Sequence, residues 1–218
     1  ANVSHELKTP LTSISGFAEI MKDGFVKPED IQGFAADIYK ESQRLIRLVE
    51  DIIHLSRLDE GGGGLEQQEI DLLDLAHTVE DRLQALASQD QVTLSVEGDH
   101  ALIRGLPSIV EEMVYNLCDN AIKYNRPEGS VTVRVADGPD EVTLSVEDTG
   151  IGIPEEDQER VFERFYRVDK SHSKAIGGTG LGLSIVKHGA ALHSARVELD
   201  SVSGKGTTVR LIFPREQG

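Results

Sequence analysis

Four consecutive glycines, Gly61 to Gly64, restrict the fold of this chain more than any other feature. Each glycine inside a helix costs about 1 kcal/mol relative to alanine, so such a run interrupts any regular element. Apolar residues before the run recur at helical spacing, whereas helical and alternating patterns are mixed after it. We therefore interpret residues 61–70 as a hinge between two units, residues 1–60 and residues 71–218.

The first unit is predicted to be a helical hairpin. Apolar residues recur at three- and four-residue spacing over residues 7–21 and again over residues 31–58. Residues 23–28 combine a helix stop with a proline, and Glu29 and Asp30 are expected in the first turn of the next helix. The unit therefore consists of two antiparallel helices.

The second helix is long for a two-helix unit. At about 1.5 Å per residue, residues 29–60 span roughly 45 Å, and a single antiparallel neighbour leaves part of such a stripe exposed. Pairing of two hairpins into a four-helix bundle would cover the stripe, so a homodimer is the favoured interpretation. Packing of the hairpin on the second unit of the same chain is the alternative.

The second unit mixes two periodicities. Five segments alternate apolar and polar residues, as strands with one buried face do, and three others carry helical stripes. Together they predict an α+β fold, in which the helical hairpin precedes a two-layer α/β sandwich. The predicted strands are residues 92–96, 131–135, 142–146, 197–199 and 209–213, and the predicted helices are residues 72–86, 107–124 and 181–193.

The composition limits the partners of the chain. With 22 basic and 38 acidic residues, its net charge of −16 argues against nucleic acid and against direct contact with an anionic membrane. The single cysteine, Cys118, excludes an internal disulfide and fits a reducing compartment. The sequence has no run of 18 apolar residues and no signal-peptide pattern. Because it begins without Met, we expect it to be a piece of a longer protein.

Two further glycine-bearing segments lie beside predicted regular elements. Residues 148–154 follow a predicted strand, and residues 177–183 run into a predicted helix. Glycines before a helix let the backbone approach a phosphate with free N–H groups, although such segments are also ordinary turns. The sequence has no Gly-x-x-x-x-Gly-Lys-Ser/Thr string, and no apolar strand leads into residue 177. Neither a P-loop nor a dinucleotide-binding fold is therefore predicted.

Polar residues recur on one face of the helix predicted at residues 107–124. Asn116 and Asn120 are four residues apart and share a face, and Lys123 and Tyr124 follow on the next turn. Two amide oxygens, a cation and an aromatic ring could hold a hydrated Mg²⁺, a phosphate and an adenine. A solvated helix face with Tyr124 in the core explains the same pattern.

A histidine lies near the start of the chain, in the string Ser4-His5-Glu6-Leu7-Lys8-Thr9-Pro10. His5 and Thr9 share a helical face, which is not the face of the apolar stripe. Pro10 removes the hydrogen bond to the Glu6 carbonyl and is expected to loosen the helix beside His5. Isolated exposed histidines commonly have no function, so these residues alone leave the role of His5 open.

In chain order, these segments resemble the sequence boxes of the sensor histidine kinases of two-component systems. Each short motif is weakly specific, but six in the expected order and spacing are highly specific, and the match covers essentially the whole chain. The corresponding segments are residues 4–11 (H box), 116–124 (N box), 148–152 (G1 box), 162–166 (F box), 178–183 (G2 box) and 204–208 (a last glycine motif).

The resemblance implies two domains and their cofactors. Residues 1–60 would be a dimerisation and histidine-phosphotransfer domain. Residues 71–218 would be an ATP-binding domain of the gyrase, Hsp90, histidine kinase and MutL superfamily, which uses ATP and Mg²⁺. A mobile lid over the nucleotide is implied for residues 167–176.

The resemblance also implies roles for individual residues in the second domain. Asn120 would ligate Mg²⁺, while Asn116 and Lys123 would help to hold the triphosphate. Asp148 would accept a hydrogen bond from the adenine amino group, and Tyr124 would pack on the base. The other residues assigned to nucleotide binding are Gly150, Gly152, Ile153, Phe165, Gly178, Thr179, Gly180, Leu181, Gly182 and Thr208.

The implied reaction is attack by a neutral ring nitrogen of His5 on the γ-phosphorus of ATP, with Asn116 as part of the catalytic site. Glu6 is the candidate for polarising the proton on the other ring nitrogen, although neighbouring helix residues point about 100° apart. The phosphoryl group would pass to an Asp in the receiver domain of a response regulator. Glu6 and Thr9 match an acid-x-x-Thr pattern that implies dephosphorylation of that partner, with Thr9 positioning a water.

Two other functions are compatible with parts of the sequence. A nucleotide-binding regulatory or phosphatase module would use ATP without phosphorylating His5. A chaperone-like ATPase clamp would keep the nucleotide boxes but lack the H box, so the complete string from His5 to Pro10 argues against it. The kinase interpretation places the chain in the cytoplasmic portion of a membrane-anchored bacterial sensor.

Overall fold

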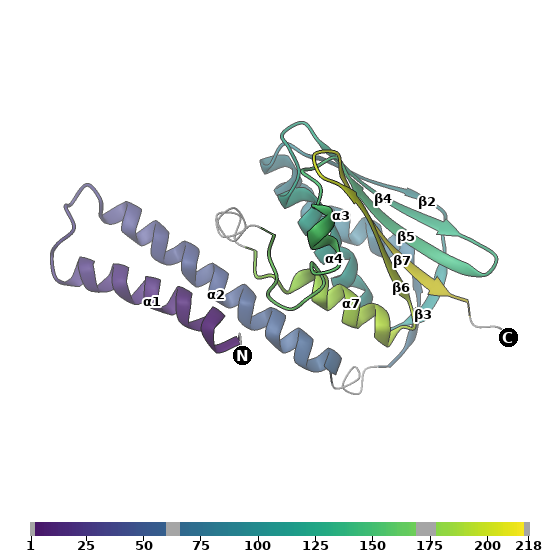
Figure 1. The fold of residues 1–218 in the computed structure, drawn as a ribbon, viewed down its shortest axis with the longest axis horizontal. Coiled ribbons are helices and arrows are strands. Elements are labelled where there is room, and N and C mark those ends of the chain that lie inside the picture. Colours follow the sequence, from purple (N-terminus) through teal and green to yellow (C-terminus); the bar gives the residue numbers. More distant parts are fainter. Residues whose placement is uncertain (1–2, 60–65, 169–177, 216–218) are drawn as a thin grey trace.

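The computed structural model describes residues 3–59, 66–168 and 178–215. Figure 1 shows a two-helix hairpin that extends from a domain built of one main sheet with helices on one of its faces. The helical first part and the mixed second part agree with the predicted α+β fold. None of the described helices combines the length and the apolarity needed to cross a membrane.

The hairpin consists of α1 (Val3–Lys22) and α2 (Ile31–Asp59). The rings of Phe17 and Phe34 meet edge to face across it, with their centroids 5.7 Å apart. Gly24 makes the turn with a positive φ of 74°, a conformation that favours glycine. The second helix begins at Ile31, so Glu29 and Asp30 precede its first turn instead of lying within it.

The main sheet has five strands in the order β2-β4-β5-β7-β6. Only β2 and β4 are parallel, and the predicted antiparallel pair is confirmed by the register of Val133 opposite Val146. Each of the five predicted strand segments corresponds to one of these strands, although β2 begins one residue after the predicted start at residue 92. The strands are β2 (Thr93–Gly98), β4 (Ser130–Asp137), β5 (Glu141–Asp148), β6 (Arg196–Val202) and β7 (Gly206–Pro214).

Three helices cover one face of this sheet (Figure 1). They are α3 (Leu72–Gln89), α4 (Pro107–Lys123) and α7 (Gly182–Leu192), and all three coincide with predicted helices. Their apolar faces meet alternate residues of the strands, as Met113, Val114, Leu144 and Leu211 show, each almost fully buried. The two-layer arrangement predicted from the periodicities is therefore correct.

Three short elements were not predicted. The strands β1 (Gln68–Asp71) and β3 (Leu102–Gly105) pair with each other in a separate two-stranded sheet, and α5 (Glu155–Gln158) is a single turn. The first strand begins inside residues 66–70, which the sequence assigned to the hinge, because Ile70 is buried opposite Ile103. The first half of the predicted hinge, residues 61–65, lies outside the described residues.

The hairpin lies against the second domain through α2 and α7 (Figure 1). Leu48, Leu55 and Leu58 of α2 form a buried cluster with Ile109, Leu181 and Ile185. Packing of the hairpin on its own chain, the alternative weighed for the sequence, therefore occurs. A second stripe on α2 remains exposed, with Ile46, Val49 and Ile53 each at least 41% accessible.

Candidate active site

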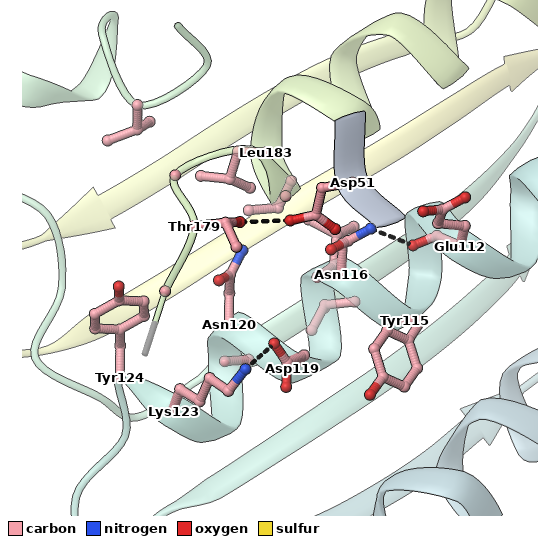
Figure 2. A pocket seen from close by; sticks show the side chains of 18 of the residues that line it. Asp51, Glu112, Tyr115, Asn116, Asp119, Asn120, Lys123, Tyr124, Thr179 and Leu183 are labelled. Atoms are coloured by element: carbon pink, nitrogen blue, oxygen red, sulfur yellow. Dashed lines mark hydrogen bonds and ion pairs between the residues drawn. The ribbon is translucent and has the colours of Figure 1, made fainter. Parts of the chain in front are cut away.

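A cavity of about 1170 Å³ opens between α4, α7, the end of β5 and helix α2 of the hairpin. Figure 2 shows its α4 side, where polar side chains from successive turns project toward the segment that carries Thr179. Most of the residues that the sequence assigned to nucleotide binding line this cavity. They are Asn116, Asn120, Lys123, Tyr124, Asp148, Gly152, Ile153, Gly178, Thr179, Gly180 and Gly182.

The polar face of α4 follows directly from its sequence. Pro107 lies at the helix start, where a missing N–H is tolerated. The opposite face of the helix, which includes Leu117, is buried. Asn116 donates through Nδ2 to the Glu112 carbonyl at 2.9 Å, which leaves its Oδ1 directed away from the helix backbone. Lys123 is paired with Asp119 at 2.5 Å, so this cation starts in an ion pair on its own helix (Figure 2).

The space above the two asparagines depends on a glycine. A Cβ atom on Gly182 would lie 2.9 Å from Oδ1 of Asn116 and 3.5 Å from Nδ2 of Asn120. Gly182 is also the first residue of α7, where unpaired backbone N–H groups favour an anion. With the Asn116 amide oxygen on one side and a helix N-terminus on the other, this space fits a phosphate with its divalent cation.

Residue 180 must be glycine for a different structural reason. Its φ is +76°, and a Cβ there would lie 2.9 Å from the backbone of Phe165, whose N–H donates to the Gly180 carbonyl at 2.8 Å. The F-box and G2-box segments therefore lie against each other. Of the implied lid at residues 167–176, residues 169–176 lie outside the described residues.

Asp148, the last residue of β5, is held in a fixed orientation. Its Oδ1 accepts hydrogen bonds from the backbone N–H groups of Gly150 at 2.8 Å and Thr207 at 3.2 Å. Burial raises the pKa of this carboxyl despite these bonds. Within the described residues Oδ2 accepts no hydrogen bond, so it can accept one from a ligand amine in the cavity.

Four residues assigned to nucleotide binding do not line the cavity. Gly150 contributes its N–H to Asp148, and Leu181 and Phe165 belong to the apolar cluster between the two domains. Thr207 lines the cavity where the sequence assigned Thr208, because neighbouring residues of a strand point to opposite faces.

The histidine of the H box lies on α1, outside the cavity wall. The side chain of His5 is 79% exposed, and its Nδ1 lies 3.5 Å from Oε1 of Glu6. Oε2 of Glu6 lies 3.5 Å from the Arg167 guanidinium, which does line the cavity. Glu6 therefore contacts both His5 and the cavity wall, although adjacent residues of a helix point about 100° apart.

Thr9 and Pro10 lie one turn further along α1. The Thr9 hydroxyl donates to the His5 carbonyl at 3.1 Å, and the helix continues through the buried Pro10. The expected loosening therefore consists of the one missing hydrogen bond, without an interruption of the helix.

No local pattern in the sequence indicates that α2 contributes to the cavity. Asp51 of α2 accepts a hydrogen bond from the Thr179 hydroxyl at 2.5 Å (Figure 2). Burial raises the pKa of Asp51 to about 6, and the nearby Glu112 acts in the same direction. His54 of the same helix contacts the Glu112 carboxylate. These contacts join residues far apart in the chain, so no local pattern reveals them.

The second domain combines a sheet covered by helices on one face with a glycine-bounded cavity above two asparagines. This combination agrees with the ATP-binding class predicted for the domain. The family model described as histidine kinase-, DNA gyrase B- and HSP90-like ATPase matches residues 105–217. The model of the His Kinase A (phospho-acceptor) domain matches residues 1–61. The chain belongs to the sensor histidine kinase family.

Individual relatives agree with this membership. The sensor-like histidine kinase SenX3 of Mycolicibacterium smegmatis is 38% identical over 98% of this chain and 56% of its own length. A crystal structure of full-length ShkA in complex with AMPPNP is 25% identical with a TM-score of 0.72, over 98% of this chain and 45% of that one. The histidine kinase ThkA in complex with the response regulator protein TrrA, 24% identical with a TM-score of 0.78, covers 99% of this chain and 60% of that one and shares the fold. The chain thus spans about half the length of SenX3.

Proposed function

We propose that this chain is the catalytic core of a sensor histidine kinase that phosphorylates His5 with Mg-ATP. The observation that carries the proposal is the continuity between the two parts of the site. Glu6 lies beside the exposed His5 and pairs with Arg167 of the nucleotide cavity. In the proposal, the nucleotide in the cavity and His5 lie at two ends of one connected polar region.

In this proposal, different residues of the cavity bind different parts of the nucleotide. Oδ2 of Asp148 would accept from the adenine amino group, and Tyr124 lines the same end of the cavity. The triphosphate would reach the start of α7 and the space beside Gly182. Asn120, with Asn116 beside it, would hold Mg²⁺, which neutralises charge on the phosphates when bound. Lys123 would exchange its ion pair with Asp119 for a phosphate oxygen.

The chemistry at His5 requires one nitrogen to attack and the other to carry the proton. Because Nδ1 faces Glu6, Nε2 is the nitrogen free to attack. A bond forms between Nε2 and the γ-phosphorus, and the bond from phosphorus to the β–γ bridging oxygen breaks, with its electron pair leaving on ADP. Glu6 stabilises or accepts the proton on Nδ1 as positive charge develops on the ring.

Two further partners are part of the proposal. The exposed stripe of Ile46, Val49 and Ile53 supports a homodimer through the hairpin, in line with the family of the first domain. The complex of ThkA with the response regulator TrrA supports transfer from His5 to the receiver domain of a regulator. The proposal also includes a location in the bacterial cytoplasm, where ATP is available, as the cytoplasmic portion of a membrane-anchored sensor.

Dephosphorylation of the regulator is a second activity that one residue favours. The Thr9 side chain lies one turn from His5, so a released hydroxyl could position a water beside a bound phospho-aspartate. In this conformation the hydroxyl donates to the His5 carbonyl, and phosphatase action requires it to rotate. The Thr9→Ala variant is expected to retain phosphorylation of His5 and to lose release of phosphate from a phosphorylated regulator. Unchanged release would remove Thr9 from that reaction.

The kinase proposal is tested with ATP labelled on the γ-phosphate. The wild-type chain is expected to acquire acid-labile, alkali-stable label when Mg²⁺ is present. His5→Gln should lose the label while binding ATP normally, and Asn120→Asp should lose both. Persistence of label in His5→Gln would contradict the proposal.

A further inference from the structure

A carboxylate of the hairpin lies at the wall of the nucleotide cavity. Asp51 of α2 lines the cavity, and its Oδ2 accepts a hydrogen bond from the Thr179 hydroxyl at 2.5 Å (Figure 2). Thr179 belongs to the glycine-bearing segment before α7, 128 residues further along the chain. This contact therefore joins the hairpin directly to a segment of the sheet domain that is assigned to nucleotide binding.

The contact with Asp51 uses the only proton of the Thr179 hydroxyl. The oxygen of the same hydroxyl accepts from the N–H of Leu181 at 3.3 Å, just before the start of α7. A hydroxyl group can donate one hydrogen bond and no more. Thr179 therefore cannot donate to a phosphate oxygen while it donates to Asp51.

Thr179 lies at the end of the cavity that would receive the phosphates. It is three residues before Gly182, the first residue of α7, whose missing side chain leaves space beside Asn116. The N-terminus of a helix favours a negative charge. In this structure Asp51 supplies a negative charge to that end of the cavity, through its contact with Thr179.

The surroundings of Asp51 do not favour a second anion beside it. Burial raises the pKa of Asp51 to about 6, and Glu112 of α4 acts in the same direction, whereas His54 and Lys123 act in the opposite direction. At pH 8 the carboxyl is therefore mostly ionised. A triphosphate at the start of α7 would add further negative charge near this carboxylate.

We infer that Asp51 is an autoinhibitory residue, which competes with the triphosphate of ATP for the Thr179 hydroxyl. The inference rests on the proposed kinase function. Binding of ATP would break this one contact between the hairpin and the sheet domain, while the apolar cluster around Leu55 stays in place. By thermodynamic reciprocity, a hairpin held in this contact lowers the affinity for ATP by the same factor.

Removing the carboxylate tests the inference, because a competitor and a nucleotide-binding residue give opposite results. Asp51→Ala should lower the dissociation constant for Mg-AMPPNP at pH 8 by at least about fivefold. Asp51→Asn, which keeps the shape, should also lower it. Titration calorimetry measures the constant. Damage to the fold would raise the constant, so poor folding cannot imitate the expected result.

Two further variants separate competition for the hydroxyl from a general effect of charge. Glu50→Ala, which removes the exposed carboxylate next to Asp51, should change the constant by less than about twofold. Thr179→Val removes the group for which Asp51 competes. In the Thr179→Val background, Asp51→Ala should therefore lower the constant by no more than about twofold.

Several results would overturn the inference. They are an unchanged or higher dissociation constant in Asp51→Ala, an equal gain in Glu50→Ala, and an equal gain from Asp51→Ala with and without the Thr179 hydroxyl. Failure of both the wild type and Asp51→Ala to bind Mg-AMPPNP would instead overturn the kinase function, and the inference with it.

Discussion

The two parts of this chain are stabilised in different ways. The sheet domain has one continuous apolar core between three helices and five strands. Few residues of the hairpin are buried, and the sheet domain buries three of them, Leu48, Leu55 and Leu58. The nucleotide cavity therefore belongs mainly to a self-sufficient domain, whereas the position of His5 depends on contacts that another surface provides.

The contacts between the two parts are also more polar than either interior. Around the small apolar cluster lie Asp51 with Thr179, His54 with Glu112 and Asp59 with Arg164, the last pair at 2.8 Å. Interfaces of this kind between domains resemble transient protein–protein interfaces. In the proposed reaction, ATP binding and delivery of its phosphoryl group therefore depend on two parts of the chain that have separate stabilities.

The largest difference is expected for core substitutions in the two parts. Leu144→Ala, in the centre of the sheet, should lower the free energy of unfolding of the sheet domain by about 2–5 kcal/mol. Leu55→Ala, between α2 and α7, should affect that domain less and instead increase hydrogen exchange in α2. Urea titration and hydrogen exchange measure the two effects. Equal losses in both variants would show that the chain unfolds as one unit.

The exposed stripe of the hairpin should respond to charge. Replacing Ile46 and Val49 together by Glu is expected to weaken dimerisation at least about hundredfold, because two carboxylates would be buried in the bundle. Sedimentation equilibrium measures the change. Ala36→Glu lies on another face of α2 and serves as the control. An unchanged mass in the double variant would place the dimer contact elsewhere or show that there is none.

Removing the charge at the adenine end should weaken nucleotide binding without disturbing the hairpin. Asp148→Asn is expected to raise the dissociation constant for ATP by about tenfold to a hundredfold, since a hydrogen bond to a charged group contributes about 1.5–3 kcal/mol. Titration calorimetry measures the constant. Asp200→Asn, at an exposed carboxylate that pairs with Arg210 on β7, is the matched control. Equal affinity in the two variants would remove Asp148 from adenine recognition.

The smallest expected effect is a pH dependence of docking. Because burial raises the pKa of Asp51 from 3.8 to about 6, the folded state binds the extra proton. This contribution to stability is complete below about pH 4 and is lost as the pH rises through 6. Asp51→Asn should therefore gain a few degrees in melting temperature over the wild type between pH 4 and pH 7. A difference that does not change with pH would contradict the raised pKa.

Local patterns predicted the longer elements and most of the cavity, but not the short elements β1, β3 and α5 or the junction of the two parts. The polar face of α4 and the glycines near α7 were found because each function there uses residues close together in sequence. The role of Asp51 has no local signal because it comes from a contact with Thr179, which lies 128 residues away in the chain. The glycine motif indicates Thr208, whereas Thr207 lines the cavity, because a glycine motif alone does not determine which face of the strand a residue takes.

The central claim is that ATP bound in the sheet domain phosphorylates His5 on the hairpin. The most direct measurement is mass spectrometry at neutral pH, to map the phosphorylated residue after incubation of the chain with Mg-ATP. We expect a single phosphate on the peptide that contains His5. We expect no phosphate on this peptide when the same experiment is done without Mg²⁺. A phosphate on any other residue, or none on a chain that binds ATP, would contradict it.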